Sequence, residues 1–136
     1  MSNPSGHVRP EDVETQQFEW GVLKWLSTPT VTGATEFSAG IVQLVPGAGH
    51  ERHTHPESEE ILYVISGQGQ QTVDGETFEI GPGELVFIDA DTPHSTINTG
   101  WETLKLVAIY GPPGPEGVLR EHPDATIHPP GTFPEH

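Results

Sequence analysis

The sequence predicts an all-β domain, either a small antiparallel β-barrel or a double-sheet jelly roll. Sixteen Gly and fourteen Pro are spread along 136 residues, and such frequent breaks favour many short strands over long helices. About eight to ten short β-prone runs lie between the breaks, which is typical of small closed or two-sheet β-folds. The length suits one core. We therefore expect an N-terminal arm over residues 1–17, a barrel over 18–110 and a Pro/Gly-rich tail over 111–136.

The expected strands follow one another between turn signals. The apolar run FEWGVLKWLS is predicted as one strand, and Asp74-Gly75 between two β-like runs predicts a hairpin. A Pro-Gly pair ends another run, and a Gly-Pro-Gly turn precedes a further one. The runs that we expect to be strands or hairpins are residues 18–27, 35–47, 60–67, 70–80, 80–89, 94–98 and 102–110.

The two ends of the chain are expected to contribute little to the sheet. Residues 1–17 are polar without periodicity, so a loose arm is expected there. The tail beyond Tyr110 is too rich in proline to pair inside a sheet, and we expect it to cover the barrel or a partner. Brief helical segments are expected only around residues 10–15 and 116–121.

Composition limits the classes of partner. The formal net charge is −15, with 5 Lys plus Arg against 20 Asp plus Glu, and such a field repels nucleic acids and anionic membrane surfaces. Neither a long apolar run nor a signal-peptide pattern is present, so we expect a soluble cytoplasmic protein. The acidity fits a halophilic host or an ordinary acidic protein equally well. Cysteine is absent, so a bound metal needs His, carboxylate or carbonyl ligands.

A cluster of histidines and glutamates in GHERHTHPESEEILYVISG is the strongest functional signal. His53 and His55 are two residues apart, which places them on one face of a strand. Glu60 has the parity of Leu62 and Val64, so it faces the interior if they do, and a buried carboxylate needs a partner or a ligand. His94 follows a turn and begins another strand. Three nitrogens and one oxygen from two adjacent hairpins can therefore converge on one metal ion.

The other histidines are expected to have no role in that site. His50 has the opposite parity to His53 and is expected to face solvent or the barrel mouth. The remaining four lie in the arm and tail: His7, His122, His128 and His136. The segment GQGQQT resembles a Gly-rich phosphate loop but opens no helix, which argues against phosphate binding there.

These residues carry a resemblance to the cupin superfamily, over about residues 35–110. The first cupin motif is Gly, five residues, His-x-His, three or four residues, Glu, six residues, Gly, and it is met in full by Gly47, His53, His55, Glu60 and Gly67. The second motif is Gly, five residues, Pro-x-Gly, two residues, His, three residues, Asn, and it is met by Gly83, His94 and Asn98. The Pro and Gly of that motif are replaced here by Asp89 and Asp91.

The resemblance implies a small single-domain cupin with one divalent metal ion held by His53, His55, Glu60 and His94. Glu59 is the alternative carboxylate, because the shorter motif spacing selects it. Glu60 is favoured by its inward parity and by the six residues before Gly67. A site of three histidines and one carboxylate leaves one or two open positions and accepts Fe, Mn, Ni, Co or Zn.

Cupins include dioxygenases, isomerases, lyases, decarboxylases, storage proteins and sensors, so the fold leaves the function open. A metal-dependent enzyme of dioxygenase, lyase or isomerase type, acting on a small oxygenated molecule, is the first hypothesis. A small-molecule or metal-binding module without turnover is the alternative. A sugar isomerase would need a basic grip on phosphate, which five cations disfavour. No catalytic acid or base is identified, and Thr96, Gln43 and Tyr110 are expected pocket residues on parity alone.

A homodimer is the expected assembly. Small single-domain cupins, which this chain resembles, commonly form dimers, and the run FEWGVLKWLS offers two tryptophans for a shared interface. The competing hypothesis places Trp20 and Trp25 in the core of the protomer itself.

Overall fold

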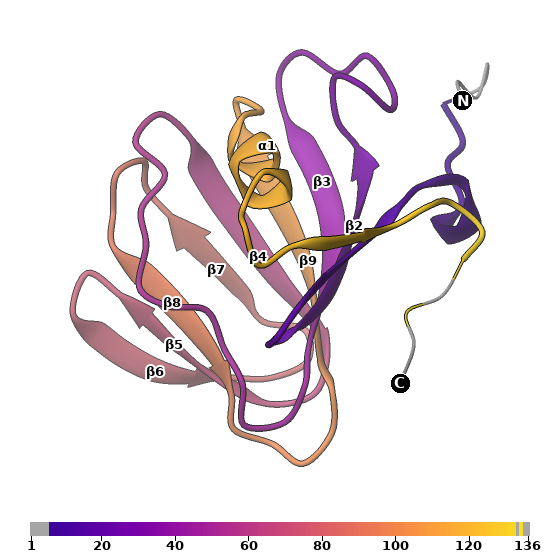
Figure 1. Cartoon of the computed structure of the whole chain (residues 1–136). Coiled ribbons are helices and arrows are strands. Elements are labelled where there is room, and N and C mark those ends of the chain that lie inside the picture. Colours follow the sequence, from indigo (N-terminus) through magenta and orange to yellow (C-terminus); the bar gives the residue numbers. More distant parts are fainter. Residues whose placement is uncertain (1–5, 133, 135–136) are drawn as a thin grey trace.

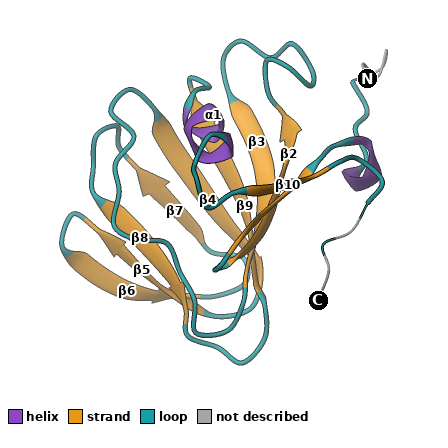
Figure 2. Cartoon of the chain, in the orientation of Figure 1, coloured by secondary structure: helices purple, strands orange, loops and turns teal. Residues whose placement is uncertain are grey.

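Two antiparallel sheets face one another and enclose the core (Figure 1). The structure, a computed structural model, describes residues 6–132 and residue 134, so His136 and the first five residues of the expected arm lie outside it. The larger sheet has seven strands in the order β10-β1-β2-β3-β9-β4-β7, and the smaller has three in the order β6-β5-β8. Strands dominate the described chain and helix is confined to two short segments (Figure 2).

The larger sheet is built from β1 (Thr15–Phe18), β2 (Gly21–Ser27), β3 (Ser38–Leu44), β4 (Glu59–Ser66), β7 (Leu85–Ile88), β9 (Leu104–Gly111) and β10 (Thr126–His128). The smaller is built from β5 (Gly69–Val73), β6 (Glu76–Ile80) and β8 (His94–Asn98). The helical segments are a 3-10 turn, Pro10–Asp12, and α1, Pro115–Arg120. The predicted all-β jelly-roll class is therefore confirmed.

Turn chemistry explains why the expected hairpin forms where it does. Asp74 and Gly75 both have positive φ, 50° and 83°, which is the backbone that a two-residue turn of type I′ requires. The strands on either side pair in register, from Val73↔Glu76 to Gly69↔Ile80. Both short helical segments also lie where the sequence predicts them, each with proline in its first turn.

The run FEWGVLKWLS is not one strand, contrary to our prediction. It turns at Glu19 and Trp20, so that β1 and β2 form a hairpin with Phe18 opposite Gly21. A Cβ at Gly21 would lie 1.9 Å from the Gln43 carbonyl oxygen of β3, so only glycine permits this close approach. The pairing also places Thr15–Gln17 in the sheet rather than in a loose arm.

The tail returns to the sheet as well. Thr126, Ile127 and His128 pair with β1 at the outer edge of the larger sheet, and the His128 side chain contacts Gln17 at 2.8 Å. An edge position needs only one row of backbone hydrogen bonds, which is why a proline-rich tail can still add a strand there.

The core is apolar and continuous between the two sheets. Leu44, Val64 and Leu104 are fully buried, and Trp25 is 6% exposed and packs against Tyr110 at 5.4 Å between ring centroids. Phe18 and Leu23 are also buried. Phe18, Leu23 and Trp25 of the run FEWGVLKWLS therefore lie in the core of the protomer. Trp20 is half-buried, and a subunit interface formed by this segment stays a prediction.

Candidate metal centre

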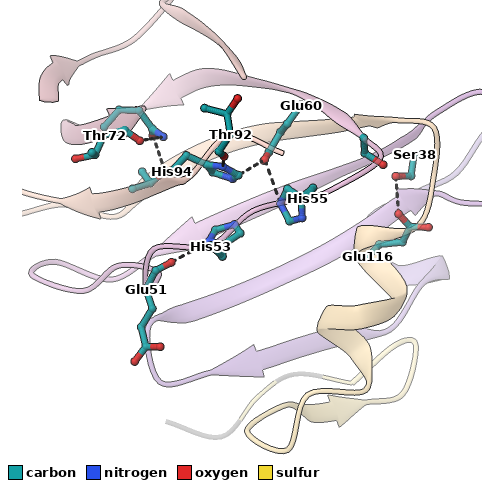
Figure 3. Close-up of polar contacts among 12 residues, drawn as sticks. Ser38, Glu51, His53, His55, Glu60, Thr72, Thr92, His94 and Glu116 are labelled. Atoms are coloured by element: carbon teal, nitrogen blue, oxygen red, sulfur yellow. Dashed lines mark hydrogen bonds and ion pairs between the residues drawn. The ribbon is translucent and has the colours of Figure 1, made fainter. Parts of the chain in front are cut away.

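Four polar side chains converge at one end of the space between the sheets (Figure 3). His53 and His55 come from the connection between β3 and β4, Glu60 from β4, and His94 from the start of β8. The site thus joins the two sheets and the connection between β3 and β4. Glu59 is exposed whereas Glu60 is 5% exposed, so the alternation of β4 turns Glu60 and not Glu59 toward the histidines.

Backbone pairing positions His53 beside His94. We predicted a strand through His53 and His55, but the structure has only an isolated bridge, in which His53 and His94 exchange hydrogen bonds of 3.1 and 3.0 Å. Residues paired in this way carry their side chains on the same face, and the two imidazole centroids are 4.2 Å apart. Pro56 and the turn after it prevent a longer ladder.

The turn of the second motif holds the loop of the first. The backbone N–H of Asp91 donates to the His55 carbonyl at 2.8 Å. Asp91 has φ of 60°, the left-handed backbone for which glycine is the usual residue and which aspartate tolerates better than most. The departure from the cupin pattern at Asp91 therefore preserves the turn.

Asn98, the last residue of the second motif, is structural. Its side-chain N–H groups donate to the carbonyls of Leu44, at 2.9 Å, and Glu102, at 2.7 Å, and its side-chain oxygen accepts from the N–H of Gly100 at 2.9 Å. These bonds tie β8 to β3 and to the following loop. They leave no side-chain atom of Asn98 for a ligand role.

Two imidazoles are held in the orientation that a metal ligand needs. Nδ1 of His53 contacts the Glu51 carbonyl and Nδ1 of His94 contacts the Thr92 carbonyl, each at 2.8 Å. A carbonyl only accepts, so each Nδ1 carries the proton and a neutral ring keeps a lone pair on Nε2. Backbone carbonyls are frequent partners of metal-ligating histidines.

The inner atoms of the cluster face one another without hydrogen bonds. Oε1 of Glu60 lies 3.0 Å from Nε2 of His94 and 3.4 Å from Nε2 of His55. All three atoms are buried and lack a partner of hydrogen-bond geometry among the described residues. Ligand atoms of His53, His55 and His94 lie within 4.8 Å of one another. Converging lone pairs of this kind repel unless a cation lies between them, so the arrangement can hold a divalent ion.

The electrostatic environment follows from the same contacts. Burial alone would raise the pKa of Glu60, but the imidazoles of His55 and His94 outweigh it and lower the pKa to about 2. Burial alone would lower the pKa of His94, and Glu60 together with the Thr92 carbonyl raises it instead. Burial lowers the pKa of His53. Protons and a metal ion therefore compete for the same atoms.

His50 is half-buried and lines both the inner cavity and the outer cleft beside the cluster. Burial lowers its pKa to about 4, its Nε2 has no hydrogen-bond partner among residues 6–132, and its ring packs edge-on against Trp20 at 4.2 Å between centroids. The connection in which His50 lies is not a regular strand, so alternation does not apply to it.

Two spaces that share lining residues adjoin the cluster. An inner cavity of about 20 Å³ lies beside His53, Glu60 and His94, and an open cleft of about 580 Å³ lies outside it. His50, His53, Tyr110 and Leu119 line both spaces. Thr96 and Tyr110 line the inner cavity as predicted. Gln43 does not, because Val42 and Leu44 take the inward positions of β3. A separate hollow of about 340 Å³ beside residues 29–33 has no ionisable lining.

No helix among the described residues is long and apolar enough to cross a membrane. His7, exposed in the N-terminal segment, and His128, paired with Gln17, have no part in the cluster. His122 lines the outer cleft, where it lies beside Asp124.

Known proteins resemble this chain in sequence and in structure. The chain is 33% identical over 117 residues to the polyketide synthase protein CurC of Streptomyces cyaneus, covering 82% of this chain and 76% of that protein. It is 33% identical over 121 residues to the oxalate decarboxylase OxdC of Bacillus subtilis, covering 81% of this chain but 31% of that protein. The structure of KdgF from a Halomonas species superposes with a TM-score of 0.70 at 20% identity, covering 81% and 96% of the two chains.

A family model also matches this chain. Residues 40–110 match the model of the cupin domain, and this range contains both motifs and all four side chains of the cluster. Sequence, topology and family model agree, and the chain belongs to the cupin family.

Proposed function

We propose that the protein is a divalent-metal-dependent enzyme that acts on a small oxygenated molecule. The observation that carries the proposal is the set of buried, unpartnered ligand atoms on His55, Glu60 and His94, joined by His53. Side chains that satisfy no hydrogen bond are costly to bury, and a bound ion would offset that cost. The cupin relatives include proteins named as an oxalate decarboxylase and a polyketide synthase component, which supports an enzymatic role.

His53, His55, Glu60 and His94 would hold the ion, and their mixture of nitrogen and oxygen ligands admits Fe, Mn, Ni, Co or Zn. A bound metal would supply Lewis-acid polarisation of an oxygen on the substrate, or redox chemistry if it is iron or manganese. The protein contributes the rest: the carbonyls of Glu51 and Thr92 orient two imidazoles, and apolar side chains line much of the inner cavity.

The first experiment measures metal content. Protein purified from its host, and apoprotein reloaded with each metal separately, should bind one ion per chain. The joint change His53→Ala and His55→Ala should abolish stoichiometric binding while the circular dichroism spectrum keeps its β-sheet form. Unchanged metal content in the double variant would overturn the proposed site.

The second experiment separates an enzyme from the alternative, a binding module. The reloaded protein would be screened for oxygen consumption and for product formation with 1,3-diketones, hydroxy ketones, flavonols and oxalate. Turnover that depends on the metal and disappears in the double variant supports an enzyme. Saturable ligand binding without turnover supports the module instead.

We also propose a two-fold dimer, through a different surface from the one that the sequence suggested. Leu85 and Phe87 on β7 are 57% and 50% exposed, and Leu85 pairs directly with exposed Tyr63 on β4. Ile65 continues this apolar outer face of the sheet. A contiguous apolar face on an outer strand favours association. Light scattering should give twice the chain mass of 14.7 kDa, and Phe87→Lys should halve it.

A further inference from the structure

The charge of the inner cavity limits which molecules can bind beside the metal. Among the described residues that line it, Glu60 is the only carboxylate, and none is lysine or arginine. The other lining groups are neutral: apolar side chains, Thr96, Tyr110 and imidazoles. An imidazole buried beside a dication stays unprotonated, because two positive charges would share a site of low polarity.

A divalent ion together with ionised Glu60 therefore leaves a net charge of +1 in the cavity. A monoanionic chelator brings this charge to zero. A dianionic chelator would leave an unpaired negative charge in surroundings without a cationic side chain, which is unfavourable in a buried site.

The charge of the outer cleft also favours monoanions over dianions. Its lining contains three carboxylates, Glu19, Glu51 and Asp124, and one permanent cation, Arg52. The cleft therefore has net negative charge, as does the whole chain at −15. An anion that approaches the cluster through this cleft meets that charge, and a dianion is repelled more strongly than a monoanion.

The volumes of the two spaces determine where the body of a bound chelator would lie. An inner cavity of about 20 Å³ holds little more than one water molecule. Only the chelating atoms can enter it, so the remainder must occupy the cleft of about 580 Å³. His50 lines both spaces and packs against Trp20 of the outer cleft, with ring centroids 4.2 Å apart, and the unpartnered Nε2 of His50 is available to a polar group there.

We propose, resting on the proposed metal site, that the natural ligand is a monoanionic chelator with an uncharged body, and that the site discriminates against dicarboxylates. Two oxygens of the chelator would bind the ion, and its body would lie in the cleft that Trp20 lines.

Oxalate and oxamate provide a matched pair of probes, because both are small planar bidentate chelators and they differ by one unit of charge. Binding of each to the cobalt(II)-loaded protein would be followed by the visible absorption of the ion, at roughly 0.5 M KCl to screen long-range repulsion. The ratio of oxamate to oxalate affinity would be divided by the same ratio for aqueous cobalt(II). This normalised ratio should be on the order of tenfold or more, which is about 1.4 kcal/mol of discrimination.

A cation placed at the boundary should remove the discrimination. Leu119 lines both spaces from α1, and it is partly exposed, so a larger side chain can be accommodated there. Leu119→Arg should lower the normalised ratio by on the order of tenfold, whereas the neutral control Leu119→Gln should change it by less than about twofold.

The outcomes separate the two proposals. If the protein fails to bind cobalt(II), the metal site and the inference are both overturned. If it binds cobalt(II) and the wild-type normalised ratio is near one or favours oxalate, the metal site stands and the charge selectivity is overturned. The wild-type measurement is decisive even if Leu119→Arg does not fold.

Discussion

Replacing Glu60 with glutamine should abolish tight metal binding, whereas the same change in Glu59 should leave it intact. The two residues are adjacent in sequence and differ in environment: Glu60 lies 3.0 Å from Nε2 of His94, and Glu59 is exposed to solvent. Glutamine has nearly the shape of glutamate, so the change removes charge with little effect on packing.

The magnitude follows from burial. Removing one partner of a buried charge pair costs about 3–5 kcal/mol, and each 1.4 kcal/mol is tenfold in affinity. Metal affinity should therefore fall by roughly a hundredfold to a few thousandfold. Metal at a hundredfold excess over its Kd stabilises the wild-type fold by about 2.7 kcal/mol, which for 136 residues raises Tm by roughly 10 °C.

Differential scanning calorimetry with and without nickel(II) would measure this shift. At the metal concentration that raises the wild-type Tm by roughly 10 °C, Glu60→Gln should gain no more than about 1–2 °C, and Glu59→Gln should gain as much as the wild type. If Glu59→Gln loses the shift and Glu60→Gln keeps it, the assignment of the carboxylate ligand is wrong.

Four further outcomes are expected. The first concerns the apoprotein in EDTA, where the pKa of Glu60 is lowered to about 2. The contribution of Glu60 to stability is therefore present above its unfolded pKa of about 4.5 and is lost as pH falls toward 2. Urea unfolding from pH 5 to pH 2 should show a steeper loss of stability in the wild type than in Glu60→Gln. The pKa of His94 is raised, so its effect on stability has the opposite pH dependence. The contribution of His94 to stability is complete below its unfolded pKa of about 6.5 and is lost as pH rises through its folded pKa. Equal stability of the apoprotein at pH 6 and pH 9 would contradict this. At Asp91, where φ is 60°, valine should cost about 1–2 kcal/mol or more in chemical denaturation while glycine is tolerated. EDTA should remove the metal without unfolding the protein, because the core between the sheets is apolar and independent of the cluster; cooperative unfolding by the chelator would make the metal structural instead.

Local patterns in the sequence were sufficient for much of this protein. Frequent Gly and Pro break the chain into short strands, and Asp74-Gly75 supplies the positive φ values of a hairpin turn, because turn geometry depends on neighbouring residues alone. Alternation along β4 selected Glu60 over Glu59 for the same reason, since the side-chain period of a strand is a local property. The motif spacing also named the three histidines that the structure brings together.

The tertiary structure alone decided the features that depend on distant segments. Whether Glu19 and Trp20 turn or continue a strand depends on the approach of β3 to Gly21, and the pairing of β10 depends on an edge offered by β1. The neighbours of His50 could not be predicted from alternation, which fails outside a ladder, because its ring packs against Trp20, thirty positions earlier in the chain. The charge of the cavity is likewise a sum over side chains from many elements, and such a sum exists only after the chain has folded.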